Sequence, residues 1–594
     1  MIKISAKLYR SLRGKDNYAL NLMDFFFMGV IFVFAFLHVS YGVDLADTSY
    51  SLGNYENLSN MGMTWTIATL GANIVGKILT ILPGGHTWLG MNIYATLLLV
   101  ICVEQIYIFL RRYMNGWIIF IGEILALSLC WCPKVILYNY LSYILFSVAI
   151  MVLVRGMESD SRLLMGTAGA ILAVNIMVRF PNIMEAALIV AVWADGFFKR
   201  KKFRVVLGDT RACIVGFGMG LVVVCTIIFC LYGINAIPDM LASLYKISST
   251  STGYSPLQML QSIFFMYQTT IVSVFYLVSM IIVFSFIFPF LKKSWMRVLL
   301  VIAESIAFAF FISWEYKIGF YSFDYYNFSS FQHFAIIFLE ISFLVCMATI
   351  VTKQSFLEEK FWAVIVIIVI VVTPLGSNNA LSPVYNNLFL VAPLVLWMIW
   401  KRLFEGKNFL KDNGLIQWAA IRTLTVLIVL MFLAQSVGFG IFYIFGDAGF
   451  PYTNSINIKG NKVMIGMHTN AERAQNIEDI TEFASKNNLY GQQCIIFGEL
   501  PGLSYILDMP CAISHTWPDL SSYSIDECKK DFEKLEGEPS PVIFVNNGYY
   551  PDIWTNRQND DKVKILVSYM TDHNYKLVYS MNGIDIYTSQ ILGE

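Results

Sequence analysis

The chain has 594 residues, of which 57% are hydrophobic and only 14% are charged. Soluble domains average about 25% charged residues, so this composition excludes an ordinary cytosolic enzyme or a disordered chain and indicates a polytopic membrane protein. The 41 basic and 41 acidic residues balance. A nucleic-acid-binding protein would show a basic excess, so no nucleic acid partner is expected.

Apolar segments that are candidates for membrane-spanning helices recur along the first three quarters of the chain, and those at 117–132, 163–178 and 361–374 are short for a span. About thirteen are predicted, near residues 19–40, 88–110, 117–132, 136–154, 163–178, 183–198, 212–232, 262–291, 297–313, 334–352, 361–374, 388–400 and 417–445. The stretch 64–82 is too polar for a span and is predicted to form helices lying at the membrane surface. Residues 1–445 are therefore expected to form an α-helical membrane domain.

The distribution of basic residues predicts the orientation of these helices. With the N-terminus on the cytoplasmic side, the loops on that side hold 24 basic residues and the opposite loops before residue 446 hold five. This asymmetry is the positive-inside pattern. An odd number of spans then places the rest of the chain outside the cytoplasm. The chain ends Gln-Ile-Leu-Gly-Glu, without an ER-retention signal, and we expect a bacterial plasma membrane.

Residues 446–594 differ in composition from the membrane domain, with 11 basic and 20 acidic residues. Apolar runs at 494–497 and 541–545 predict buried strands, and an Asn-Gly pair at 582–583 predicts a terminal hairpin. Helical patterns cover 471–488, 524–535 and 563–569. The sequence thus predicts a small extracytoplasmic α/β domain. Three of its cysteines, Cys494, Cys511 and Cys528, could include a disulfide in an oxidising exterior, and the sequence leaves this open.

The first outer loop, residues 41–87, carries two carboxylates directly after the first span. It reads Tyr41-Gly-Val-Asp44-Leu-Ala-Asp47-Thr-Ser-Tyr50. A carboxylate at this place can act as a general base toward an acceptor hydroxyl or can hold a metal ion. The alternative is that Asp44 and Asp47 are a helix cap and a solvated loop charge, and residue types alone do not decide between the two.

Other polar groups are predicted on the same side of the membrane. Lys134 and Arg179 are isolated cations at the outer turns of apolar hairpins, where each could bind phosphate or reach lipid headgroups. Asn378 and Asn379 lie in an Asn-rich outer loop, whose amides suit sugar hydroxyls and also suit tight turns. No P-loop, HExxH or GxSxG motif points to another chemistry, because the GxxxxGK at 71–77 lacks the following Ser or Thr.

This pattern resembles the integral-membrane glycosyltransferases of the GT-C type. The resemblance rests on the cytoplasmic N-terminus, the acid-then-aromatic segment Asp47-Thr-Ser-Tyr50, the surface helices of the first outer loop and the extracytoplasmic C-terminal domain. It implies transfer of a sugar from a polyprenyl-phosphate donor to an extracytoplasmic glycan, lipid or protein. Asp47 and then Asp44 are the implied catalytic residues, and Arg179, Lys134, Tyr50, Asn378 and Asn379 the implied substrate-binding residues. A divalent metal ion is compatible with the pattern but not required by it.

Three other functions fit a chain of this composition. A flippase or transporter of lipid-linked glycans would need a polar route through the bilayer, which acids within spans such as Glu104, Glu185 and Glu304 could line. A glycan polymerase would share the many spans and outer loops. A non-catalytic assembly partner would use the acidic domain to bind other envelope proteins.

Overall fold

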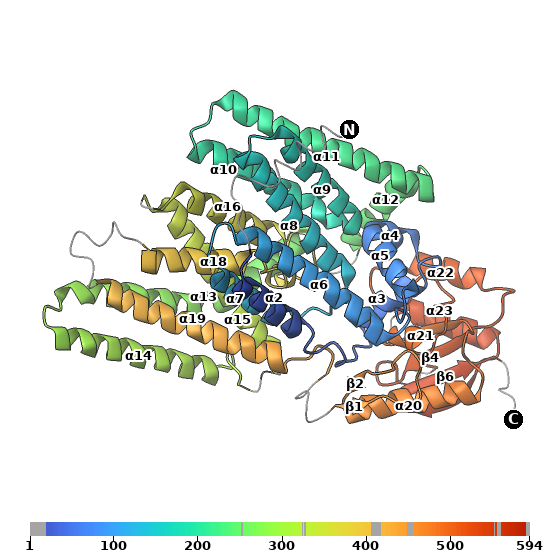
Figure 1. The fold of residues 1–594 in the computed structure, drawn as a ribbon. Coiled ribbons are helices and arrows are strands. Elements are labelled where there is room, and N and C mark those ends of the chain that lie inside the picture. The colour runs from blue at the N-terminus through green and yellow to red at the C-terminus, as the bar shows by residue number, and fades with distance from the viewer. Residues whose placement is uncertain are drawn as a thin grey trace.

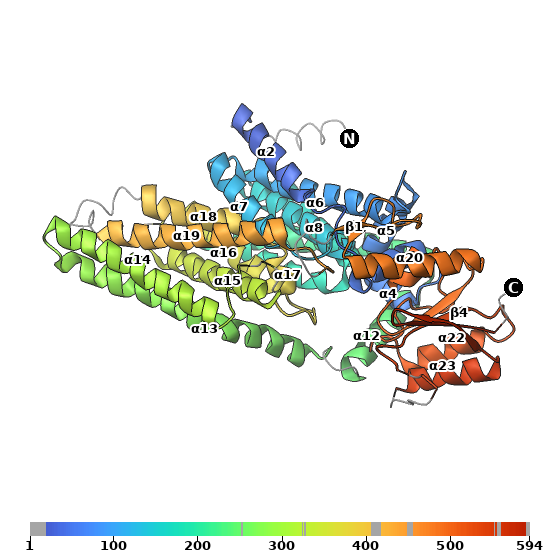
Figure 2. The ribbon, with the colours of Figure 1, turned by 90° about the horizontal axis from the view of Figure 1, so that it is seen from below.

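The computed structural model describes residues 20–250, 254–323, 325, 328–353, 355–405, 417–447, 455–551, 553–554 and 560–589. These residues form a large bundle of helices and a smaller domain that contains a four-stranded sheet. The smaller domain, orange to red in Figure 1, lies at one end of the bundle, and the view in Figure 2 shows the same arrangement. The described chain is thus a mainly helical membrane-type protein with a C-terminal sheet domain.

Each of the thirteen apolar segments contains helix. In chain order these helices are α2 (Leu22–Ala35), α6 (Trp88–Leu110), α7 (Gly116–Ser128), α8 (Leu137–Glu158), α9 (Arg162–Val178), η1 (Phe180–Ile189) continued by α10 (Val190–Phe198), α11 (Phe203–Tyr232), α13 (Pro256–Ile287), α14 (Ser294–Lys317), α15 (Phe328–Val351), α16 (Leu357–Val372), α18 (Val391–Trp400) and α19 (Gln417–Phe442). Among the described residues, eight helices are long and apolar enough to cross a membrane. The protein is therefore polytopic, and the count of thirteen spans stays a prediction.

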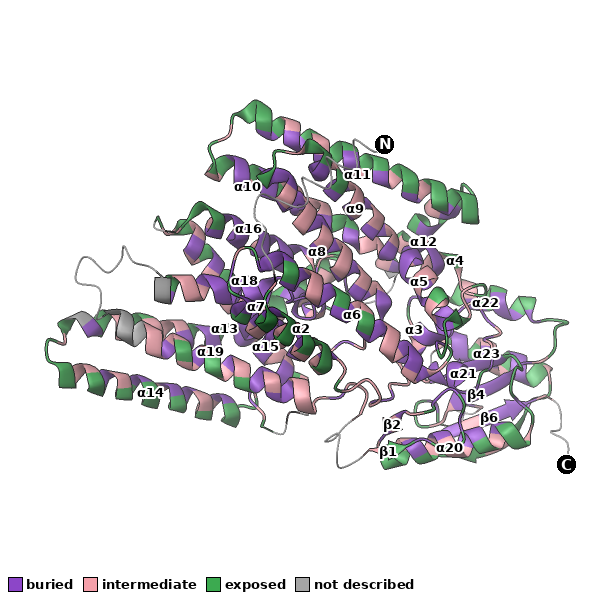
Figure 3. Cartoon of the chain, viewed as in Figure 1, coloured by how far each residue is buried: buried purple, intermediate pink, exposed green. Residues whose placement is uncertain are grey.

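Shorter elements connect these helices: α12 (Ala236–Thr250), η2 (Phe288–Phe290), α17 (Ser382–Tyr385) and η3 (Lys401–Glu405). The outer faces of α11 and α14 are largely exposed (Figure 3). Most of their exposed side chains are apolar, and these include Ile214, Met219, Val222 and Phe310. Apolar surface of this extent is unfavourable in water and indicates a lipid bilayer around the bundle.

One acid within the first apolar segment has a structural role. Asn21 and Asp24 form a capping box at the start of α2, which satisfies backbone N–H groups that the helix leaves without partners. The Asp24 carboxylate also accepts hydrogen bonds from Arg111 Nε at 2.6 Å and from the Tyr107 hydroxyl at 2.8 Å. Because these partners are themselves buried, the pair fixes the start of α2 against the end of α6.

Three short helices occupy the loop between α2 and α6: α3 (Asp47–Glu56), α4 (Met63–Ala68) and α5 (Leu70–Ile81). The last two confirm the helices predicted at 64–82. Gly76 of α5 lies against the face of the Tyr55 ring, where a Cβ would overlap the ring. The Tyr55 hydroxyl donates to the Val135 carbonyl at 2.9 Å, which attaches α3 to the turn between α7 and α8.

The C-terminal domain contains the predicted α/β elements. Its sheet has the order β3-β4-β6-β5, formed by β3 (Cys494–Phe497), β4 (Val542–Asn546), β6 (Ile584–Thr588) and β5 (Lys576–Met581). β3 and β4 are parallel and the other pairs are antiparallel. Four helices complete it: α20 (Ala471–Lys486), α21 (Gly502–Ile506), α22 (Ile525–Lys534) and α23 (Asp561–Asp572). Cys494, Cys511 and Cys528 are free thiols.

The C-terminal domain packs directly on the loop that follows α2. A two-stranded sheet, β1 (Ile456–Asn457) with β2 (His468–Thr469), extends this contact, because the Gly42 N–H donates to the His468 carbonyl at 3.0 Å and the His468 N–H donates to the Ser40 carbonyl at 2.8 Å. Gly502 at the start of α21 lies against Ser49 of α3. As Figure 1 shows, α3, α4 and α5 therefore lie between the bundle and the C-terminal domain.

Candidate functional site

Three turns of the bundle meet beside the first loop. The Asn386 side-chain oxygen accepts hydrogen bonds from the backbone N–H groups of Trp131, at 3.1 Å, and Cys132. Gly376 lies against Pro181, so the 373–387 segment also contacts the turn after α9. The turns that carry Lys134, Arg179 and Asn378 therefore gather at the same end of the bundle as the C-terminal domain.

The turn that presents Arg179 is held by buried amides. Asn182 Nδ2 donates to the Ser142 hydroxyl at 2.6 Å and to the Asn175 carbonyl at 3.0 Å. Asn175 Nδ2 in turn donates to Glu185 Oε2 at 2.7 Å. Buried side chains that satisfy one another in this way fix a local conformation, so the direction in which Arg179 leaves the bundle is defined.

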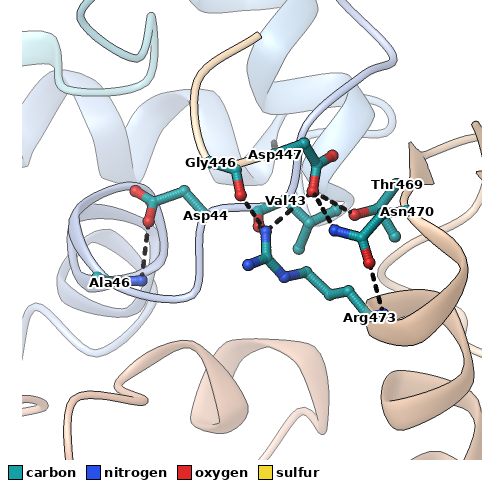
Figure 4. A network of polar contacts seen from close by, with 8 residues as sticks. All are labelled: Val43, Asp44, Ala46, Gly446, Asp447, Thr469, Asn470 and Arg473. Atoms are coloured by element: carbon teal, nitrogen blue, oxygen red, sulfur yellow. Dashed lines mark hydrogen bonds and ion pairs between the residues drawn. The ribbon is translucent and has the colours of Figure 1, made fainter. Parts of the chain in front are cut away.

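Asp44 closes the turn that begins α3. Its carboxylate accepts a hydrogen bond from the backbone N–H of Ala46 at 3.1 Å (Figure 4). It also accepts one from the backbone N–H of Thr48 at 2.7 Å. Free backbone N–H groups at a helix start carry partial positive charge, and a carboxylate there stabilises the helix. The cap considered for Asp44 is therefore present, and its charge faces the start of α3.

Asp47 is the first residue of α3 and differs from Asp44 in its surroundings. Its carboxylate makes no hydrogen bond or ion pair with the part of the chain that the structure describes, and its side chain is exposed. Protein nevertheless surrounds it on most sides, and this burial, together with the nearby Asp44 charge, raises the pKa of Asp47 to about 6. A carboxylate that is free, reachable and near neutral in pKa is suited to accept a proton.

Arg179 lies close enough to Asp47 for both charges to act on the same neighbours. The guanidinium stands over the Tyr138 ring, with 5.3 Å between Cζ and the ring centroid. Tyr138 and Cys132 each lie within electrostatic reach of both Asp47 and Arg179. Among the described residues, the guanidinium makes no hydrogen bond or ion pair, so its forked donors remain available to an anion. We call Asp47, Tyr138 and Arg179 the Asp47–Arg179 cluster.

A cavity of about 130 Å³ lies next to this cluster. Its polar lining includes Asp44, Lys134, His38 and Asn92, and its aromatic lining includes Trp88, Trp131, Tyr443 and Phe445. Cys132 also lines it and so connects the cavity to the Asp47–Arg179 cluster. The sequence did not predict that Asp44 and Lys134 share a cavity while Arg179 lies outside its lining.

Lys134 is the cation of this cavity. Its ammonium group donates to the Ala35 carbonyl at 2.5 Å, at the end of α2. Burial lowers the pKa of Lys134 to about 8, so the group is still mostly protonated at neutral pH. With one of its three protons used by Ala35, the ammonium retains two donors for a ligand in the cavity.

Tyr50 connects α3 to the C-terminal domain. Its hydroxyl lies 3.3 Å from His515 Nε2, and its ring stacks on the imidazole with 5.5 Å between centroids. Burial and the nearby Lys562 lower the pKa of His515 to about 3, so the imidazole is neutral. Because His515 Nδ1 accepts from the Trp517 N–H at 3.2 Å, the proton is on Nε2, which donates to the Tyr50 oxygen.

The two asparagines of the 373–387 segment have different surroundings. Asn378 is exposed and lies within hydrogen-bonding reach of the Tyr254 hydroxyl, which also reaches Ser522 of the C-terminal domain. Asn379 is exposed, and its backbone N–H donates to the Ser377 hydroxyl at 3.2 Å, a turn contact. Asn378 is therefore near the residues around the Asp47–Arg179 cluster, since Tyr254 acts on Tyr138 as well.

Residues that the sequence did not single out complete the surroundings: Tyr138, Tyr254 and His515. No sequence signal marks them, because their positions depend on contacts between distant segments. Within the described ranges, no three His, Cys, Asp or Glu side chains are grouped so that they could hold a metal ion. The acids considered for a transport route lie apart in the bundle: Glu185 accepts from Asn175, and Glu304 is buried in α14, which packs mainly on α13 and α19.

No family model matches the chain, and neither does any curated protein.

Proposed function

We propose that the chain is a membrane glycosyltransferase that moves a sugar from a polyprenyl-phosphate donor to an acceptor hydroxyl on an extracytoplasmic glycan, lipid or protein. The proposal includes the plasma-membrane location and the cytoplasmic N-terminus predicted from the basic residues. The observation that carries it is the Asp47–Arg179 cluster. In it, a carboxylate and a guanidinium that make no hydrogen bond or ion pair with the described residues act on the same two neighbours, Tyr138 and Cys132.

Such a pair is suited to the two charges that appear in sugar transfer. In a direct displacement, the acceptor oxygen bonds to the anomeric carbon and its proton passes to the Asp47 carboxylate. The bond from the anomeric carbon to the phosphate oxygen breaks, and the electron pair leaves with the lipid phosphate. The Arg179 guanidinium meets the charge that develops on that phosphate, and hydrogen-bond donors placed in advance at such a charge lower the barrier.

The remaining polar groups support binding rather than bond breaking. Lys134 and Asp44 line the neighbouring cavity, whose aromatic walls suit an apolar chain beside a charged group. Tyr50 and Asn378 both lie near Tyr254, where they can meet sugar hydroxyls. Asp44 acts mainly by holding the start of α3, because its two oxygens already accept backbone N–H groups.

The test uses the purified full-length chain in liposomes with a panel of polyprenyl-phosphate monosaccharides and membrane extracts as acceptor source. Sugar transfer releases the polyprenyl phosphate, whereas a flippase moves the donor intact, so release of the lipid phosphate distinguishes the two. We expect wild-type protein to release it and Asp47→Asn to lose the release. Movement of intact donor across the bilayer without release would favour the flippase instead.

A further inference from the structure

Arg473 is a residue of the C-terminal domain that reaches the backbone next to Asp44. It lies in the first turn of α20, and its side chain is 30% exposed. Arg473 Nη1 donates to the Val43 carbonyl at 2.6 Å and to the Gly446 carbonyl, and it forms an ion pair with Asp447 at 3.0 Å (Figure 4). One guanidinium thus joins three segments that are far apart in sequence.

The carbonyls that Arg473 binds lie on both sides of Asp44. Val43 directly precedes Asp44 in the chain. Gly446 packs against Asp44 with its backbone at a positive φ of 83°, so close that a Cβ would contact the Asp44 Cα and Cβ. Holding these two carbonyls together therefore fixes the position of Asp44 from the residue that precedes it and from the segment that packs against it.

Asp44 passes this constraint on to Asp47. Its carboxylate accepts the backbone N–H groups of Ala46 and Thr48, the residues on either side of Asp47. The direction of the Asp47 side chain depends on that turn, because its carboxylate makes no hydrogen bond or ion pair within the described ranges. Arg473 thus contacts Val43 and Gly446, and these two residues lie next to Asp44. Asp44 in turn holds the turn that carries Asp47, the proposed base.

The arginine is itself held in place, so the constraint originates in the C-terminal domain. Asp447 Oδ1 also accepts hydrogen bonds from the Thr469 hydroxyl at 2.7 Å and from Asn470 Nδ2 at 3.2 Å. Asn470 Oδ1 caps α20 by accepting from the Arg473 N–H at 2.9 Å. Side chains supported by further hydrogen bonds keep a site in its productive geometry, and a displacement of about 1 Å can cost about a hundredfold in rate.

We propose that Arg473 is a positioning residue for sugar transfer: from the C-terminal domain, it holds the backbone around Asp44 and thereby orients Asp47. This inference rests on the proposed function. It makes the C-terminal domain a working part of the active site, in which α20 supplies part of the support for the turn that carries Asp47.

A matched control exists at the same domain interface. Lys246 of α12 forms an ion pair with Asp526 of α22 at 2.8 Å, and both side chains are more than half exposed. Lys246→Met removes a contact between the same two parts of the chain, but one that touches neither Val43 nor Gly446. The tested variants are Arg473→Met, which removes the donors, and Arg473→Lys, which keeps a charge and donors on a side chain one bond shorter.

Two measurements are made on full-length protein in liposomes. The first is the release of polyprenyl phosphate, separated into kcat and KM. The second is the labelling of Asp47 by a water-soluble carbodiimide with an amine nucleophile, followed by mass spectrometry as the pH is lowered through about 6. The second measurement reports the surroundings of Asp47 and needs no transfer activity.

For Arg473→Met we expect kcat to fall about tenfold to a hundredfold with KM nearly unchanged. The labelling midpoint of Asp47 should move to lower pH as the turn opens to solvent. Arg473→Lys should recover part of the kcat and part of the labelling midpoint, and Lys246→Met should change neither of the two.

The proposal is overturned if Arg473→Met and Lys246→Met behave alike in both measurements. If Arg473→Met does not fold, Arg473→Lys decides: a wild-type kcat and labelling midpoint overturn the proposal. Failure of the proposed function is distinct from this, because wild-type protein would then release no polyprenyl phosphate.

Discussion

The Asp44 carboxylate accepts a hydrogen bond of 2.7 Å from the backbone N–H of Thr48, and this bond closes the turn on which Asp47 stands. Two acids three positions apart therefore have different surroundings. Asp44 is engaged at the start of α3, whereas Asp47 is exposed and has no partner among the described residues. When one of two neighbouring carboxylates is bonded and the other is free, the free one is the better proton acceptor.

The first prediction separates these two roles by substitution. Asp47→Asn should lower sugar transfer by about 10²–10⁴-fold without lowering thermal stability, because it removes the base but no hydrogen bond or ion pair among the described residues. Asp44→Ala should lower stability by about 1 kcal/mol, since it leaves two N–H groups of the turn without their acceptor. Transfer and thermal unfolding of the detergent-purified variants check both statements. Asp47→Asn with wild-type transfer would exclude Asp47 as the base.

The second prediction concerns pH. Asp47 must be ionised to accept a proton, and burial with the nearby Asp44 charge raises its pKa to about 6. Transfer should therefore increase as the pH rises through about 6 and level off above it. The stability of the protein should depend on pH in the opposite direction. A raised pKa means that the folded state favours the neutral acid. The contribution of Asp47 to the free energy of unfolding is therefore present at low pH and is lost as the pH rises through about 6.

Asp44→Asn provides the control for this pH dependence. The amide oxygen can still accept one N–H of the turn, but the charge beside Asp47 is gone. The acid limb of the pH profile should consequently move to lower pH, and only part of the way, because burial is the larger cause of the raised pKa. An acid limb that stays in place in Asp47→Asn would assign the profile to a different group.

The third prediction concerns Arg179. Arg179→Gln should weaken donor use by about tenfold or more in kcat/KM, because the guanidinium makes no hydrogen bond or ion pair among the described residues and its donors are available to phosphate. Arg179→Lys should recover part of the activity, since it keeps the charge but not the fork. Initial rates over a range of donor concentration measure this. The amides of Asn175 and Asn182 hold the turn, so thermal stability should change little in either variant.

The sequence was sufficient for the elements whose residues carry a periodic or continuous apolar pattern. Helix is present in all thirteen apolar segments, and the strands at 494–497 and 542–546 and the terminal hairpin confirm the predictions for the C-terminal domain. Helix α3 was not predicted, because Asp47–Glu56 consists mainly of residues that are polar or have small side chains. Its helical form depends on packing between α5 and α21, including the contact of Gly502 with Ser49, which no local pattern reveals.

The same limit applies to the site. The residue types indicated Asp44, Asp47, Lys134 and Arg179, but not which of them would share a space. Lys134 faces the cavity with Asp44 because its turn is bonded to Tyr55 and Asn386, which are distant in sequence. Arg179 faces Tyr138 instead. The pairing of charges thus depends on long-range hydrogen bonds rather than on spacing along the chain.

The fourth prediction tests the packing that carries α3. Gly76→Ala should destabilise the protein by about 1–3 kcal/mol, because the added methyl would overlap the Tyr55 ring. Gly29→Ala, in α2, is the matched control, since nothing lies near its Cβ position. Alanine has a higher helix propensity than glycine. The Gly29→Ala variant should therefore be as stable as the wild-type protein or more stable by up to about 1 kcal/mol. Equal thermal midpoints for both variants would contradict the close contact.

The last prediction concerns the docking of the C-terminal domain on α3. His515 is buried beside Tyr50 and Tyr523, and burial with the charge of Lys562 lowers its pKa to about 3, with Asp531 acting in the opposite sense. The unfolded chain binds a proton at His515 below its usual pKa of 6.5, whereas the folded chain does so only near 3. Stability from this group is therefore present above pH 6.5 and is lost as the pH falls toward 3.

His515→Gln should flatten that part of the pH dependence of thermal unfolding, while the same change at the exposed His86 should not. A profile that His515→Gln leaves unchanged would mean that other groups cause the acid sensitivity of this interface.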